Sequence, residues 1–212
     1  GSPVIHGGRV YIGSTDGHAY AIDLASGEPV WKQPVGEPEH PTSLEAPALV
    51  HDGRVYIGGM DGWMYVLASD DGRILHRLET GAQITGSANF LALPDGGGLI
   101  VFGSYDARLY AIDAHTAEPR WTIQTDDRIH GAAAVIDGQI MFAGCDGVLR
   151  IVEAAEGTQR QAATFTDPVI ANPVVRGDLA VVAHHGQAVA CVDWKSGKVQ
   201  WRYTECPEPI FA

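Results

Sequence analysis

A 21-residue pattern recurs five times along the chain without a gap. Its first copy, at residues 11–31, reads YIGSTDGHAYAIDLASGEPVW, and the other copies start at positions 56, 101, 141 and 181. Successive starts are therefore 45, 45, 40 and 40 residues apart. A period of this length is typical of an array of small structural units that bury their apolar faces by stacking on their neighbours.

Each copy carries two turn signals around a run of alternating apolar residues. The first turn has Asp-Gly at residues 16–17, 61–62 and 146–147, a weaker Asp-Ala at 106–107, and a departure at Gly186-Gln187. Asp-Gly between alternating apolar runs predicts a tight hairpin. The second turn starts at an acidic side chain that can accept backbone N–H bonds, in the column Asp23, Asp113, Glu153 and Asp193.

One further short apolar run precedes each window, and helical periodicity is missing throughout. We therefore expect four short antiparallel strands per repeat, here named A to D, and an all-β fold. Four-stranded units at this period are typical of β-propeller blades, with an open solenoid as the alternative. The predicted repeats are residues 2–43, 44–84, 85–129, 130–169 and 170–212, in a single propeller domain or segment spanning 1–212.

The repeat resembles that of the pyrroloquinoline-quinone-like (PQQ-like) β-propeller family. The family motif A-x-D-x-x-T/S-G-x-x-x-W is met from Ala21 to Trp31, again from Ala111 to Trp121, and loosely from Ala190 to Trp201. The resemblance implies that these tryptophans dock between neighbouring blades, so we expect them to be buried and equivalent. His76 and Gln161 stand in the same column and imply looser packing there. The resemblance also implies that the chain forms five blades of a seven- or eight-bladed ring, with a closed five-bladed ring as the alternative.

The charge balance disfavours two classes of partner. Lys and Arg total 14 and Asp and Glu total 26, which gives a formal net charge of −12. Such a surface repels nucleic-acid phosphates and anionic lipid headgroups. No apolar run reaches the length of a membrane span. The chain shows no signal peptide, and its opening GSPVIHGG resembles the interior of a longer protein, so the sequence leaves the compartment open.

Cysteine and histidine spacing predicts no metal site. Cys145, Cys191 and Cys206 form no C-x-x-C motif and are expected to be ordinary thiols, although a Cys191–Cys206 bridge is left open. His184 and His185 are adjacent, so in a strand their side chains point to opposite faces. His40 and His130 lie in crossings between repeats without an identifiable catalytic partner.

Columns that differ between repeats are free to serve recognition, because the shared columns serve the fold. Two such columns lie at the B–C turn, on the face that also carries the D–A crossings between repeats. The crossings are acidic, with Glu37, Glu39, Glu45, Asp126, Asp127, Asp167, Glu205 and Glu208. The predicted binding rim on this face is Met60, Trp63, Tyr105, Arg108, His130, His185 and Glu45, with a plain solvated rim as the alternative.

The family resemblance implies two functional branches. Quinoprotein dehydrogenases combine such repeats with a disulfide between adjacent cysteines, a stacking Trp and a calcium-held quinone, and this chain has no adjacent cysteine pair. The other branch includes lipoprotein scaffolds of the outer-membrane protein assembly machinery. We therefore expect a non-enzymatic, periplasmic or extracellular scaffold that binds a protein or a small molecule on the loop face, possesses no cofactor or metal, and joins further blades of a parent chain. The alternative is a fragment of a PQQ-dependent dehydrogenase whose cofactor site lies in blades outside this sequence.

Overall fold

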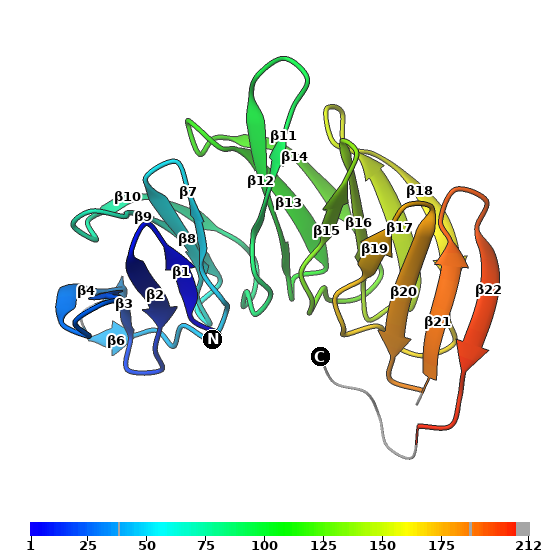
Figure 1. Ribbon diagram of the computed structural model, residues 1–212, viewed down its shortest axis with the longest axis horizontal. Helices are drawn as coiled ribbons and strands as arrows, with labels where there is room; N and C mark the ends of the chain where they lie inside the picture. Colours follow the sequence, from blue (N-terminus) through cyan, green and yellow to red (C-terminus); the bar gives the residue numbers. More distant parts are fainter. Residues whose placement is uncertain (38, 187, 207–212) are drawn as a thin grey trace. The chain divides into compact units, whose positions relative to one another are not determined.

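The computed structural model describes residues 1–37, 39–186 and 188–206. Within them the chain forms five four-stranded antiparallel sheets and one two-stranded hairpin, and each sheet pairs its strands in chain order (Figure 1). The chain divides into two compact units, residues 1–88 and 89–212, and each is described here by itself. Glu208 and the final residue Ala212 fall outside the described residues.

Unit 1 holds two four-stranded sheets and the small hairpin. The first sheet consists of β1 (Val4–His6), β2 (Arg9–Gly13), β3 (His18–Asp23) and β4 (Pro29–Pro34). The second consists of β7 (Leu49–His51), β8 (Arg54–Gly58), β9 (Trp63–Ala68) and β10 (Ile74–Glu79). Between them β5 (Gly36–Glu37) pairs with β6 (His40–Pro41), a hairpin that the repeat pattern does not predict.

Unit 2 holds three four-stranded sheets. The third sheet consists of β11 (Asn89–Ala92), β12 (Gly98–Ser104), β13 (Arg108–Asp113) and β14 (Pro119–Gln124). The fourth consists of β15 (Ala134–Ile136), β16 (Gln139–Ala143), β17 (Val148–Glu153) and β18 (Thr158–Thr164). The fifth consists of β19 (Val174–Arg176), β20 (Leu179–His184), β21 (Ala188–Asp193) and β22 (Lys198–Tyr203). Each sheet lies within one of the predicted repeats, whose outer boundaries stay predictions.

The apolar cores lie between successive sheets of the same unit. In unit 1 one cluster joins Tyr11 and Ala21 of the first sheet to Ile57 and Leu67 of the second. Unit 2 has one cluster between its third and fourth sheets and another between its fourth and fifth. Side chains alternate along a strand, so each inner strand supplies both of its neighbours. Face-to-face stacking of repeats is thus the main source of burial, as the repeat period predicts.

The docking tryptophans join each sheet to the next one. The indole N–H of Trp31 donates to the backbone carbonyl of Ser69 at 3.0 Å, and that of Trp121 donates to the carbonyl of Ala154 at 2.8 Å. Trp31 is buried and Trp121 is partly buried. The two acceptors are equivalent: Ala154 directly follows Glu153, and Ser69 follows Ala68, which takes the same column in the second repeat. The family's blade-docking role is therefore seen at these two residues.

The fourth sheet departs from the expected column. In sheets one, three and five a bulge places the Trp opposite the middle residue of strand C, as Ala21 opposite Trp31. In the fourth sheet the bulge lies nearer the end of β18, so Arg160, and not Gln161, stands opposite Ile151. Arg160 donates to the carbonyl of Trp194 at 3.1 Å, the equivalent acceptor in the fifth sheet. A displaced bulge thus puts Arg160 in the docking position in place of Gln161, and looser packing at this junction stays a prediction.

The prediction that Trp201 is buried is wrong. Its side chain is 48% exposed, whereas Trp31 is 8% exposed. Trp201 lies in the fifth sheet, and no further sheet follows it among the described residues, so it has no neighbouring turn to dock on there. The buried tryptophan of this sheet is Trp194, whose indole N–H donates to the carbonyl of Gly177 at 2.9 Å.

Candidate functional site

In unit 2 the B–C turns and the D–A crossings lie together on one side of the sheets. The N–H of Cys145, in a B–C turn, donates to the carbonyl of Arg128 in the preceding crossing at 2.9 Å. The N–H of His185 donates in the same way to the carbonyl of Pro168 at 2.9 Å. We call this side of unit 2 the loop face. Its two kinds of loop come from different strands and are tied by backbone hydrogen bonds, which fixes where their side chains emerge.

A pocket of about 260 Å³ opens on the loop face. Its lining residues come from the B–C turns of three successive sheets and the two crossings between them: Tyr105, Arg128, His130, Cys145, Pro168, Ile170 and His185. Tyr105, Cys145 and His185 occupy the same column of three repeats. The fold therefore brings together residues that are 80 positions apart in the sequence.

Tyr105 is the centre of the polar contacts in this pocket. Its hydroxyl is hydrogen-bonded to Nδ1 of His130, and the two rings lie 5.6 Å apart. The guanidinium of Arg128 lies over the Tyr105 ring, 5.3 Å from its centre. Burial and the positive charge of Arg128 lower the pKa of His130. The lowered pKa favours neutral His130, whose Nδ1 can accept a hydrogen bond from the Tyr105 hydroxyl.

Cys145 contributes a protonated thiol to the pocket wall. Burial raises the pKa of Cys145, and the neighbouring Arg128 offsets only part of that effect. A thiol of this kind is a poor nucleophile at neutral pH. Cys145, Cys191 and Cys206 are all free, so the Cys191–Cys206 bridge left open by the sequence is not formed.

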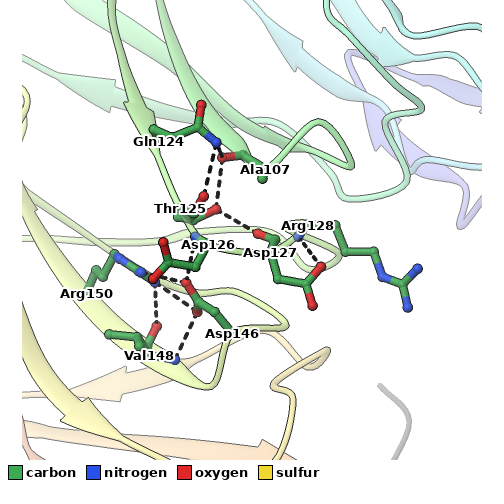
Figure 2. Close-up of polar contacts among 9 residues, drawn as sticks. All are labelled: Ala107, Gln124, Thr125, Asp126, Asp127, Arg128, Asp146, Val148 and Arg150. Atoms are coloured by element: carbon green, nitrogen blue, oxygen red, sulfur yellow. Dashed lines mark hydrogen bonds and ion pairs between the residues drawn. The ribbon is translucent and has the colours of Figure 1, made fainter.

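The crossing before this pocket is held by side-chain bonds that Figure 2 shows. The Thr125 hydroxyl bonds the carbonyl oxygens of Ala107 and Asp127 at 2.9 and 2.7 Å. The Asp127 carboxylate accepts the backbone N–H of Arg128 at 2.7 Å, while the Arg128 side chain extends away from it (Figure 2). The Asp127 carboxylate is therefore bonded to the backbone, and the Arg128 guanidinium lies over the Tyr105 ring.

Close by, Asp146 and Arg150 form a buried ion pair (Figure 2). The two guanidinium nitrogens lie 3.0 and 2.5 Å from the two carboxylate oxygens. Burial alone would raise the pKa of Asp146, but Arg150 and the backbone N–H of Val148 lower it below its usual value. In the third sheet the same position holds Tyr110, which donates to Asp106 at 2.5 Å and whose pKa is raised to about 12 by burial and by that carboxylate.

The predicted rim residues fall in both units, and each unit is described by itself. In unit 2, Tyr105, His130 and His185 share the pocket, whereas Arg108 is exposed and donates to Gln124 at 3.0 Å. Met60, Trp63 and Glu45 belong to unit 1. There, Trp63 is partly buried beneath the guanidinium of Arg77, 4.8 Å from the ring centre, Met60 is half-buried, and Glu45 accepts a bond from Ser43.

Arg128 is the charged residue of the pocket that the predicted rim lacks, and Cys145, Pro168 and Ile170 are absent from that rim as well. Arg128 stands in the crossing TDDRIHG, two residues before His130, where its charge is outnumbered by two aspartates. The alternation of the crossing could have pointed to it, because residues 128 and 130 fall on the same side of an extended segment. Because Asp126 and Asp127 precede Arg128, the crossing is interpreted as acidic and the arginine is overlooked.

The adjacent histidines His184 and His185 differ in burial, as expected for neighbouring residues of a strand. His184 is buried against Phe165, with ring centres 5.4 Å apart, while His185 is exposed. His40 is exposed in β6. Within residues 1–37, 39–186 and 188–206, no three His, Cys, Asp or Glu side chains gather as a metal site would require. In the same residues, no helix has the length and apolar character needed to cross a membrane.

Two further pockets lie outside the loop-face pocket. In unit 1 a pocket of about 400 Å³ lies between the B–C turn of the first sheet and the β5–β6 hairpin, with Val35, Pro34 and Pro41 in its wall. In unit 2 a polar pocket of about 390 Å³ is lined by Gln124, Asp126, Arg150, Gln159, Arg160 and Gln161. Both of its arginines are already bonded, to Asp146 and to the carbonyl of Trp194.

Comparison with solved structures supports the predicted propeller. The crystal structure of BamB from Moraxella catarrhalis matches 94% of this chain with a TM-score of 0.80 at 19% identity. The computationally designed Ika8 protein matches 98% with a TM-score of 0.78 at 14% identity. This chain spans 62% of the length of each of them. At these identities the likeness concerns the fold, and it confirms the predicted β-propeller class.

Sequence comparisons point to the same kind of protein. A comparison with curated proteins finds no match. A family model described as outer membrane protein assembly factor BamB matches residues 83–209, which is more than half of the 212-residue chain. The match confirms the predicted PQQ-like repeat. This chain therefore belongs to the family described as outer membrane protein assembly factor BamB.

Proposed function

We propose that this chain is a non-enzymatic scaffold outside the cytoplasm that binds a protein partner on its loop face. Family membership supports the scaffold role, because the description of the family names an assembly factor and no catalysed reaction. The same description, which refers to the outer membrane, supports a periplasmic or extracellular location. The family description does not name the binding residues, and both these residues and a protein partner on the loop face are part of the proposal.

The observation that carries the proposal is the composition of the loop-face pocket. Tyr105, Cys145 and His185 occupy one column of three repeats, yet they differ completely in chemistry. The columns that form the turns and the core keep similar residues from repeat to repeat. This column does not, so its side chains are not required for folding. Aromatic residues and arginine, as in the Tyr105–Arg128 pair, are enriched where proteins contact one another.

Site-specific photocrosslinking in the cells that make the protein tests this proposal. A photoreactive amino acid replaces Tyr105 or His185 on the loop face. Lys195 is the matched control, because it is exposed in a C–D turn of the same unit, and C–D turns lie at the opposite ends of the strands. We expect both loop-face positions to crosslink one and the same envelope protein, identified by mass spectrometry, and Lys195 to give little of it. Equal crosslinking from Lys195, or none from the loop face, would overturn the proposal.

A further inference from the structure

The fifth repeat lacks a polar pair that the other four repeats share at the B–C turn. In each of those repeats a turn carboxylate is bonded by the side chain four residues later, in the pairs Asp16–Tyr20, Asp61–Tyr65, Asp106–Tyr110 and Asp146–Arg150. As a class, tyrosine and arginine side chains stay protonated across the physiological range, so pairs of this kind do not respond to pH there. In the fifth repeat the two positions hold Gly186 and Ala190, whose side chains can form no such pair.

A carboxylate from the neighbouring crossing occupies the place of the missing one. Asp167 lies in the crossing at residues 165–173, between the fourth and fifth sheets. A Cβ at Gly186 would overlap Oδ2 of Asp167 and would lie 3.1 Å from Nδ1 of His184. The Asp167 carboxylate and the His184 ring therefore meet at the position from which the other four repeats extend their turn carboxylate.

His184 supplies the group that faces this carboxylate. The residue ends β20, is 6% exposed and packs against the ring of Phe165. Its Nδ1 lies 3.8 Å from Oδ2 of Asp167, which is too far for a hydrogen bond. In the described part of the chain this buried nitrogen has no hydrogen-bond partner. Asp167 accepts a hydrogen bond from the Thr166 hydroxyl at 2.8 Å and is 43% exposed, so its carboxylate has room to move.

Protonation changes what His184 can bond. Both ring nitrogens of an imidazolium are donors, and a charge-assisted hydrogen bond to a carboxylate is about twice as strong as a neutral one. An approach of about 1 Å would bring Nδ1 and the Asp167 carboxylate to ordinary hydrogen-bond distance. The protonated ring therefore favours a closed position of Asp167 that the neutral ring does not.

The groups around His184 determine the pH range of this change. Burial lowers the pKa of His184 most, Asp167 raises it, and Arg202 of β22 lowers it further. Asp146 and Arg150 of the fourth sheet are paired with each other, and His185 is exposed. The net lowering places the protonation of His184 below about pH 6.5, the ordinary value for histidine.

The crossing that carries Asp167 also forms part of the loop-face pocket. The N–H of Val169 donates to the carbonyl of Gly144 at 3.3 Å, and the carbonyl of Pro168 accepts the N–H of His185 at 2.9 Å. Pro168 directly follows Asp167 and lines the pocket together with His185. A movement of the Asp167 carboxylate therefore reaches the pocket wall through the next residue of the chain.

We infer that His184 and Asp167 form a pH-dependent clasp, in which protonation of His184 draws the Asp167 carboxylate onto Nδ1 and fixes the crossing against the fifth sheet. The clasp takes the place of the permanent pair of the other four repeats. The inference goes beyond the proposed function and holds whatever occupies the pocket.

NMR titration of the full, isotope-labelled chain from pH 7.5 to 5.0 tests the clasp. The ring carbons of His184 report its protonation, the carboxyl carbon of Asp167 reports the new bond, and the amides of Val169 and His185 report the crossing. We expect all of them to change with one common midpoint. His130 also titrates with a lowered pKa and lies in the pocket, so the same titration of His184→Gln isolates its contribution to these amides.

Two variants of matched charge locate the effect. Asp167→Asn should move the His184 midpoint at least about 0.5 pH unit lower, because a nearby carboxylate favours the protonated ring and partial exposure weakens that effect. Asp127→Asn is the control. Asp127 stands at the same position of the preceding crossing and bonds the backbone N–H of Arg128. We expect it to leave the His184 midpoint unchanged.

Three results would overturn the inference. The first is an equal His184 midpoint in the parent chain and in Asp167→Asn, or an equal displacement by Asp127→Asn. The second is an Asp167 carboxyl carbon that does not follow the protonation of His184. The third is an unaltered response of the Val169 and His185 amides in His184→Gln. If His184→Gln does not fold, the Asp167→Asn and Asp127→Asn titrations decide the matter by themselves.

Discussion

The indole N–H of Trp121 donates to the carbonyl of Ala154 in the next sheet at 2.8 Å, and thereby joins the third sheet to the fourth. The Trp121→Ala variant should lower the free energy of unfolding by about 3–5 kcal/mol, as expected for the loss of a packed aromatic side chain. Trp201→Ala should cost much less, because Trp201 is 48% exposed. Denaturant titration of the full chain measures both, and an equal or larger loss at Trp201 would contradict the docking assignment.

Gly157 lies beneath the Trp121 ring. A Cβ at this position would come within 2.8 Å of the indole, and the backbone φ of 70° is unfavourable for any other residue. Gly177 has a similar positive φ of 57°, but a Cβ there would meet nothing within 4 Å. Gly157→Ala should therefore lower the free energy of unfolding more than Gly177→Ala, which carries only the backbone strain, of about 1–2 kcal/mol. Equal losses in parallel denaturant titrations would show that the indole does not press on this turn.

The buried Asp146–Arg150 pair replaces a Tyr–Asp pair of the third sheet. Arg150→Met should destabilise the chain by about 3–5 kcal/mol, because it leaves Asp146 buried without its counter-charge. Arg150→Tyr should cost clearly less. Tyr110 bonds Asp106 and stacks on Phe102 at 5.3 Å, and the equivalent Phe142 already lies 5.8 Å from the Arg150 guanidinium. Thermal and chemical unfolding of both variants decide the matter, and a Tyr variant as unstable as the Met variant would refute the equivalence of the two positions.

Burial of His184 should make stability depend on pH below neutrality. Burial lowers the pKa of His184, an effect that Asp167 opposes and Arg202 reinforces. A lowered folded-state pKa means that the unfolded chain binds more protons between the two pKa values, so stability is lost as the pH falls below about 6.5. His130 contributes in the same direction.

Free energies of unfolding at pH 7.5 and 5.5 measure this effect. We expect the loss between these two values to be smaller in His184→Gln than in the parent chain. The interval lies above the range in which carboxylates with lowered pKa values take up protons, so it isolates the histidines. An undiminished loss in His184→Gln would show that this residue does not carry the dependence.

The repetition in the sequence determines the sheets but not the details of their junctions. Because every repeat solves the same packing problem, the turn dipeptides and the alternating apolar residues predicted the five sheets and the side of each sheet on which the loops lie. A gapless comparison could not reveal that the bulge of β18 is displaced, so Arg160 replaces Gln161 at the junction. Bulge position depends on local pairing energies that the side-chain pattern does not record.

The candidate site was only partly predictable for a related reason. Tyr105, His130 and His185 could be proposed from column variation and loop topology, and they do share a pocket. Arg128 could not be singled out, because its role depends on Asp127 turning toward the backbone and on the contact with the Tyr105 ring. Such side-chain choices arise in three dimensions from competing partners, and the sequence contains those partners without their geometry.

The most direct test of the scaffold account is a search for quinone chemistry in the purified chain. The sequence lacks the adjacent cysteine pair typical of the dehydrogenases with similar repeats. After incubation with Ca²⁺ and pyrroloquinoline quinone, dye-linked oxidation of alcohols and sugars is measured, and equilibrium dialysis measures the quinone bound. We expect no turnover above the quinone-only control and no tight stoichiometric binding. Turnover that copurifies with the chain, or tight 1:1 binding of the quinone, would contradict the account.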